Sequence, residues 1–220
     1  VIDGNRRIPI VLRGPDAVAW VKRFDLELDN IRAALQWSFE TGRYTEFAWL
    51  ILAVQYYWHQ RGLLDEAAVW IERLLPHCHH LDVDTHLGIK VTYVHKAVKL
   101  QRCDKVKAVI PEIRALVDAC ENALLKSNAL RWLALLAPDP VGVTEVYRRS
   151  IQIAREGRST PGASSVFGIQ VDRDVLLPKN LWTYASYLID HAETVESATL
   201  TSECLALYRA AGNASGAAFG

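Results

Sequence analysis

Apolar residues recur every three or four positions along most of this chain, whereas alternation with a period of two is scarce. The first spacing gathers apolar side chains on one face of a helix, and the second is typical of strands. Pro15 followed by Asp16 favours a helix start, and Gly42 and Gly62 favour helix ends. The pattern predicts an all-α protein with a first helix starting at Pro15 and further helices over 30–42, 46–61, 64–75, 85–100, 104–119, 121–136, 141–156, 179–190 and 194–211.

The same pattern predicts details of these helices. In the first helix, Val18, Val21 and Phe24 are expected to share the apolar face, and Asp29 or Asn30 is expected to cap a separate second helix. A polar loop is expected after Pro76. The stretch "EGRSTPGASSVFGIQVDRD" (156–174) is rich in Gly, Ser and Pro and predicts a long loop.

Several predicted helices repeat one another. Aligning "GLLDEAAVWIERLL" with "RCDKVKAVIPEIRAL" sets Asp65 against Asp104 and Leu74 against Ile113. "VGVTEVYRRSIQIAREG" forms a third copy, and "SECLALYRAAGN" ends a degenerate fourth. This period is close to the ~34 residues of a tetratricopeptide hairpin. A single hairpin cannot bury its apolar side, so stacked neighbours are needed. The chain is therefore predicted to form a right-handed α-solenoid of tetratricopeptide-like hairpins over 16–220.

The best copy, "QRGLLDEAAVWIERLL", is similar to the tetratricopeptide pattern around its inter-helix turn. Gly62 takes the place of the turn glycine and Ala67 the small position where two helices touch. The next copy departs from the pattern, because it has Val106 at the small position and no glycine at its turn. Carried over from Gly62, the pattern predicts a concave groove that binds a ligand or partner and is lined by Trp49, Tyr56, His59, Gln60, His95 and Lys99.

The N-terminal part of the chain resembles a known arrangement. "LRGPDAVAWVKRFDLELDNIRAALQWSFETG" followed by "RG" and "WIERLL" resembles the segment after the nucleotide-binding and winged-helix domains of STAND-class transcriptional regulators, of the LuxR type and the Streptomyces-antibiotic-regulator type. "SECLALYRAAGN" is similar to the end of a repeat in the same family. The match covers residues 12–75 and 200–216.

This resemblance implies a role. In that family the helical repeats form a sensor and partner-binding arm that controls attached ATPase and DNA-binding domains. The chain begins at Val1 and is expected to be a piece of a longer protein, with residues 1–15 connecting from a preceding domain. No GxxxxGK[ST] motif is present, so ATP is expected to be held by the attached domain and no cofactor by this piece.

Other groups are weaker candidates for chemistry. "HCHH" (77–80), with His86 nearby, has no second spaced pair of ligands, so a polar loop is favoured over a zinc site. No arrangement orients a Cys–His nucleophile. Asp172 and Asp174 beside Arg173 are expected to form a solvated charge patch. The sequon at Asn213 is expected to be inert in a cytoplasmic chain. We therefore predict no catalytic activity.

Composition narrows the classes of partner. The chain has 220 residues, with 25 Lys and Arg against 25 Asp and Glu, and a net charge of +0. A balanced charge argues against a large nucleic-acid footprint. No apolar run reaches the ~18 residues of a membrane span, and no secretory signal is seen. The four cysteines are expected to be reduced and mostly buried in a cytoplasmic protein.

Expected partners are a small-molecule effector, a protein or peptide, and the adjacent ATPase domain. Three alternatives remain open at this level. The chain could be a generic protein-interaction scaffold. It could be the same arm fused to a cyclase or kinase output. More remotely, it could be an enzyme whose site is not recognised.

Overall fold

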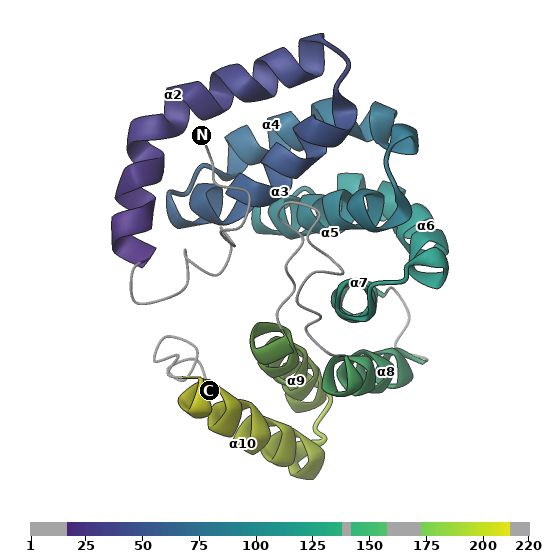
Figure 1. The fold of residues 1–220 in the computed structure, drawn as a ribbon. Helices are drawn as coiled ribbons and strands as arrows, with labels where there is room; N and C mark the ends of the chain where they lie inside the picture. The colour runs from purple at the N-terminus through teal and green to yellow at the C-terminus, as the bar shows by residue number, and fades with distance from the viewer. Residues whose placement is uncertain (1–16, 138–141, 158–172, 212–220) are drawn as a thin grey trace. The chain divides into compact units, whose positions relative to one another are not determined.

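The computed structural model of the chain describes residues 17–137, 142–157 and 173–211, and every regular element in these ranges is a helix (Figure 1). The predicted all-α class is confirmed for this part of the chain. The elements are α2 (Ala17–Glu40), α3 (Tyr44–Gln60), α4 (Leu64–Leu74), the 3₁₀ helix η1 (Leu75–His80), α5 (Val83–Lys99), α6 (Cys103–Ala119), α7 (Ala123–Leu135), α8 (Val143–Glu156), α9 (Arg173–Asp190) and α10 (Thr194–Ala210).

The chain divides into two compact units. The described part of the first unit holds α2 to α6, and that of the second holds α7 to α10. In the first unit α3 packs against α4 and α5, and α5 packs against α6. In the second unit α7 packs against α8 and α9, and α9 packs against α10. Each unit therefore contains two helical hairpins whose leading helices touch. The predicted connector over 1–15 lies outside the described residues.

The two helices predicted around Asp29 are one helix. α2 runs without interruption for 24 residues, and it bends along its length in Figure 1. Asp29 does not cap a new helix, because its carboxylate lies 3.4 Å from the guanidinium of Arg32 on the helix surface. No glycine or proline stands at this point, so the backbone can continue.

The predicted apolar face of α2 is also wrong in part. Phe24 packs on Tyr57 with ring centroids 5.4 Å apart, but Val18 is 70% exposed. Each step of three residues falls short of a full turn by about 60°, so Val18 lies about 120° around the helix from Phe24. A spacing of three residues from Val18 to Phe24 therefore does not keep both side chains on the buried face of the helix.

Two predicted loops are helical where the structure describes them. The segment after Pro76 belongs to η1, and α9 begins at Arg173 instead of 179. Pro178 lies inside α9 and is buried against the second unit's core. A proline in the second turn removes only one hydrogen-bond donor near the start of the helix, so packing can offset its cost. Residues 158–172, including Asp172, and the sequon at Asn213 lie outside the described residues.

Four inter-helix turns share one hydrogen-bond scheme. Each contains a residue with positive φ, and the amide that follows donates to the carbonyl five residues earlier, as in a Schellman cap. The carbonyl of that following residue then accepts the first bond of the next helix. The positive-φ residues are Gly42, Gly62, Gln101 and Ala192, and the closing bonds are Arg43 to Ser38, Leu63 to Trp58, Arg102 to Ala97 and Glu193 to Leu188, at 2.8–2.9 Å.

The same turn also occurs at positions where the residue with positive φ is not glycine. Gly62 has φ of 68°, as its place in the tetratricopeptide pattern predicts, and Ala67 is fully buried. Gln101 and Ala192 adopt the same conformation without being glycine, with φ of 57° and 63°. Val106 is 2% exposed at the position equivalent to Ala67. The α3–α4 and α5–α6 hairpins of the first unit and the α9–α10 hairpin of the second are therefore closed by the same backbone turn.

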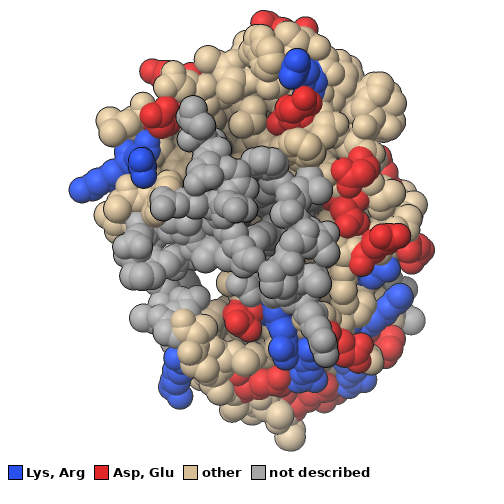
Figure 2. Space-filling model, viewed as in Figure 1, with Lys and Arg blue, Asp and Glu red and all other residues tan. Residues whose placement is uncertain are grey.

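Ion pairs join helices that are separated by one other helix in the sequence. Arg32 donates to both carboxylate oxygens of Glu66 at 2.8 and 2.7 Å, linking α2 to α4. Arg148 pairs with Glu196 at 3.0 Å and Arg155 with Glu203 at 2.6 Å, linking α8 to α10. On the face seen in Figure 2, basic and acidic side chains lie side by side over the region of α8 to α10. Such paired charges leave little net field for a polyanion.

Apolar side chains form the core of each unit. Among the aromatic side chains of α3 and α4, Phe47, Tyr57 and Trp58 are buried, at 0–1% exposure, while Trp70 is half-buried. Cys78, Cys120 and Cys204 are buried and not disulfide-bonded, as predicted for these three thiols. No helix in the described ranges is both long and apolar enough to cross a membrane.

The positive φ at Ala192 leads to a prediction about the stability of the chain. A residue with a Cβ is strained there, so Ala192→Gly is expected to raise the free energy of unfolding by about 1 kcal/mol. This corresponds to about 2–4 °C in the Tm of a chain of this size, measured by circular dichroism. Ala206→Gly, an exposed change inside α10, should lower the Tm instead. Equal shifts in both variants would show that the turn carries no strain.

Candidate functional site

The six residues predicted to line a groove lie on α3 and α5. Trp49, Tyr56 and His95 are half-buried, whereas His59, Gln60 and Lys99 are exposed. The imidazoles of His59 and His95 lie next to each other, with ring centroids 5.4 Å apart. Trp49 stands ten residues before His59, or about 15 Å along the helix, and so is not part of this cluster. The structure therefore brings together the two histidines at the carboxyl ends of α3 and α5.

A buried lysine lies between the same two helices. Lys96 is 1% exposed, and its Nζ donates to the backbone oxygen of Gln55 at 3.1 Å. Thr92 donates to the side-chain oxygen of Gln55 at 3.3 Å. Lys96 makes no ion pair with any residue that the structure describes, and burial lowers its pKa from 10.5 to about 8. A buried, unneutralised ammonium is costly, and such groups concentrate at functional sites.

Sequence reasoning missed Lys96. A signal was present, because Lys96 follows the buried residues Ile89 and Tyr93 by seven and three positions. That spacing places all three on one helix face. The expectation that lysine is solvated concealed it. Since the amine is covered by protein, it can act on the electrostatics of the α3–α5 contact but is not accessible to a substrate.

A second buried charge lies between α5 and α6. Lys90 is 4% exposed, and its Nζ lies 2.5 Å from a carboxylate oxygen of Glu112. The other carboxylate oxygen lies 2.9 Å from Nε2 of His86. Burial lowers the pKa of His86, which keeps the imidazole neutral at physiological pH. Lys90 is therefore neutralised by Glu112, unlike Lys96, and this pair is a structural contact between the helices.

The histidines of "HCHH" take part in aromatic packing. In a 3₁₀ helix residues i and i+3 eclipse each other, so His77 and His80 fall on the same side. Both stack on Tyr44, with centroids 4.0 and 5.3 Å apart. Cys78 is buried, and burial raises the pKa of its thiol to about 11, so it is protonated and weakly nucleophilic. No group of three or more His, Cys, Asp or Glu in the described ranges is arranged to hold a metal ion.

Asp174 and Arg173 do not lie in a loop, because both belong to the first turn of α9, where each is exposed. The candidate site is therefore the α3–α5 contact. It carries the His59–His95 pair, which belongs to the predicted groove, and the buried Lys96, which was not predicted.

Comparison of the chain with protein-family models, with curated proteins and with solved structures finds no match.

Proposed function

We propose that this chain is the effector- or partner-binding helical-repeat arm of a STAND-class transcriptional regulator. The observation that carries the repeat assignment is the inter-helix turn that recurs with one hydrogen-bond scheme in both units. The resemblance of residues 12–75 to the segment after the nucleotide-binding and winged-helix domains of these regulators supports the family. The finer proposal is a right-handed solenoid that binds along one face.

The proposed mechanism is a shift of population. An effector or partner bound to the arm favours one arrangement of the attached ATPase and DNA-binding domains, and can do so only if it binds that arrangement more tightly. The arm itself has no catalytic step, ATP is held by the attached domain, and DNA is contacted by the winged-helix domain. The protein acts in the cytoplasm, where these regulators meet nucleotide and DNA.

The test has two parts. The gene that encodes this chain is expected to specify a phosphate-binding loop and a winged helix upstream of Val1. In the full-length protein, the double variant His59→Ala, His95→Ala is expected to raise the effector or partner concentration for half-maximal reporter output at least tenfold. ATP binding should be unchanged.

Arg114→Ala, an exposed change on α6, is the matched control and should leave the response intact. An upstream region encoding a cyclase or kinase would overturn the regulator assignment. If the histidine variant responds like the control, the α3–α5 surface is not the binding site.

A further inference from the structure

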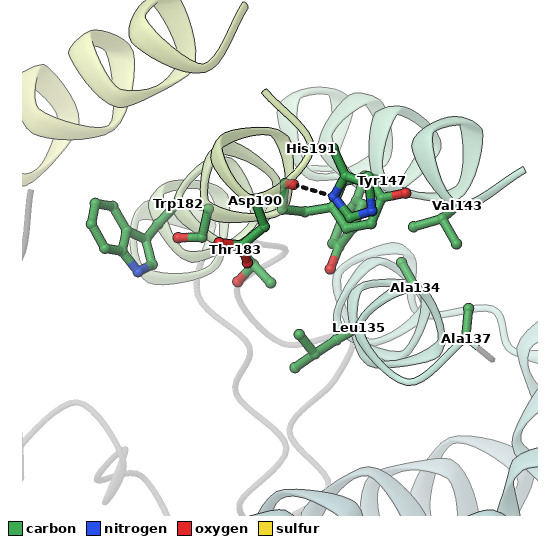
Figure 3. A pocket seen from close by; sticks show the side chains of 11 residues that line it. Ala134, Leu135, Ala137, Val143, Tyr147, Trp182, Thr183, Asp190 and His191 are labelled. Atoms are coloured by element: carbon green, nitrogen blue, oxygen red, sulfur yellow. Dashed lines mark hydrogen bonds between the residues drawn. The ribbon is translucent and has the colours of Figure 1, made fainter. Parts of the chain in front are cut away.

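The second unit contains a pocket of about 530 Å³ between α7, α8 and α9 (Figure 3). Its size falls within the range of small-molecule sites. In the close-up the indole of Trp182 lies at one end, and Val143 and Ala137 lie at the other. The residues that line this pocket include Leu135, Tyr147, Thr183, Tyr187, Asp190 and His191.

Flat rings and apolar groups form the walls of this pocket. Tyr187 stacks on His191 with centroids 4.1 Å apart and lies 5.5 Å from Tyr147. Leu135 lines the same pocket and is 46% exposed, which is unusual for a large apolar side chain. Aromatic and aliphatic walls of this kind suit a flat hydrophobic ring.

The polar groups nearest solvent offer hydrogen-bond acceptors. Nδ1 of His191 lies 2.8 Å from the backbone oxygen of Tyr187. A carbonyl can only accept, so Nδ1 carries a hydrogen, and in the tautomer with that single N–H the Nε2 atom is an acceptor. The hydroxyl of Thr183 donates to the backbone oxygen of Lys179 at 2.7 Å, which leaves its own oxygen to accept.

Asp190 adds an exposed carboxylate, which carries the formal negative charge among the lining residues. Three acceptors and one negative charge call for a cationic donor. A primary ammonium supplies three N–H groups and a positive charge, and aromatic faces add favourable cation–π attraction.

One polar group is buried in the wall. Tyr147 is fully buried, and its hydroxyl has no hydrogen-bond partner among the residues that the structure describes. Buried hydroxyls are normally hydrogen-bonded, and an unmet one costs about 1–3 kcal/mol. This oxygen is closed off from solvent, so the unmet hydrogen bond lies within the wall and is not offered to a ligand.

We propose that this pocket binds a small aryl amine, with its ammonium on Asp190 and His191 and its ring between the aromatic walls. This deepens the proposed effector-binding function and rests on that function only for the consequence of binding. The site lies in the second unit and is separate from the α3–α5 surface.

The test is calorimetric titration of the chain with four related probes. Tyramine is expected to bind at least tenfold more tightly than tyrosol, which lacks the charge, or 4-hydroxyphenylacetate, which reverses it. Phenethylamine, which keeps the ring and the positive charge, should bind about as tightly as tyramine. Asp190→Asn should weaken tyramine at least tenfold, while Asp118→Asn, an exposed change on α6, should have no effect.

Equal binding of tyramine and 4-hydroxyphenylacetate would overturn the proposal, as would equal affinities for tyramine in Asp190→Asn and Asp118→Asn. Undetectable binding of all four probes would also overturn it. If tyramine binds as expected but does not change reporter output in the full-length protein, the pocket assignment stands and the regulatory function fails. If output responds to another effector while tyramine does not bind, the opposite holds.

Discussion

Replacement of Lys96 by methionine is expected to raise the free energy of unfolding by about 2 kcal/mol at pH 7. Holding an ammonium whose pKa falls from 10.5 to about 8 costs on the order of 3 kcal/mol, and the hydrogen bond to Gln55 recovers about 1 kcal/mol. Methionine fills a similar volume without a charge. Urea denaturation at pH 7 measures the difference.

The pH dependence gives a second readout of the same substitution. Because the pKa of Lys96 is lower in the folded state, the unfolded state binds more protons between pH 8 and 10.5. Stability should therefore rise with pH across this window in the parent chain, and this contribution should be missing from Lys96→Met. Below about pH 8 both states are protonated and the full cost is present.

Lys107→Met is the control for this prediction, since Lys107 is an exposed residue of α6 whose weak pair with Asp104 is solvated. Its effect should stay within about 0.5 kcal/mol. A Lys96→Met chain that is less stable than the parent would show that the amine has a partner that stabilises its charged form.

The substitution Asn180→Ala is expected to lower the free energy of unfolding by about 3 kcal/mol. Asn180 is fully buried, and its amide donates to the hydroxyls of Ser127 and Ser150 at 2.8 Å each. Ser127 in turn donates to the backbone oxygen of Ser150 at 2.7 Å. The change leaves a cavity and removes the donor from two buried hydroxyls, and both effects destabilise.

The matched experiment replaces the whole polar cluster. The triple variant Ser127→Ala, Ser150→Ala, Asn180→Leu removes donors and acceptors together, so it should cost less than Asn180→Ala alone. Gln152→Ala, on the exposed side of α8, should change stability by less than about 0.5 kcal/mol. If the triple variant loses as much as the sum of its parts, the three side chains do not act as a cluster.

The sequence was a good guide where local signals and tertiary packing agree. Seven of the predicted helices, those matching α3 to α8 and α10, begin and end within about two residues of the observed bounds. The turn at Gly62 followed from its glycine. The equivalent turn at Gln101 could not be found this way, because its backbone hydrogen bonds hold a residue that gives no sign of positive φ.

Errors arose where a local signal was overridden. Asp29 is a good cap, but α2 continues through this position, packs on α3 and leaves Asp29 solvated. The helix expected from 179 begins at Arg173, and Pro178 is buried inside it. The pocket in the second unit depends on three helices, α7, α8 and α9, that come together in space. No local pattern reports such a convergence.

The buried position of Asn180 has a consequence for recognition. Thr183, Tyr187 and Asp190 follow Asn180 at helical spacing on α9, so the contact that fixes Asn180 against α7 and α8 also sets the rotation of α9 about its own axis. A ligand that binds beside these side chains meets a preorganised wall, so little entropy is lost in ordering those side chains. A substitution of Asn180 should therefore weaken ligand affinity by disordering the pocket wall, even though no residue that contacts the ligand has been changed.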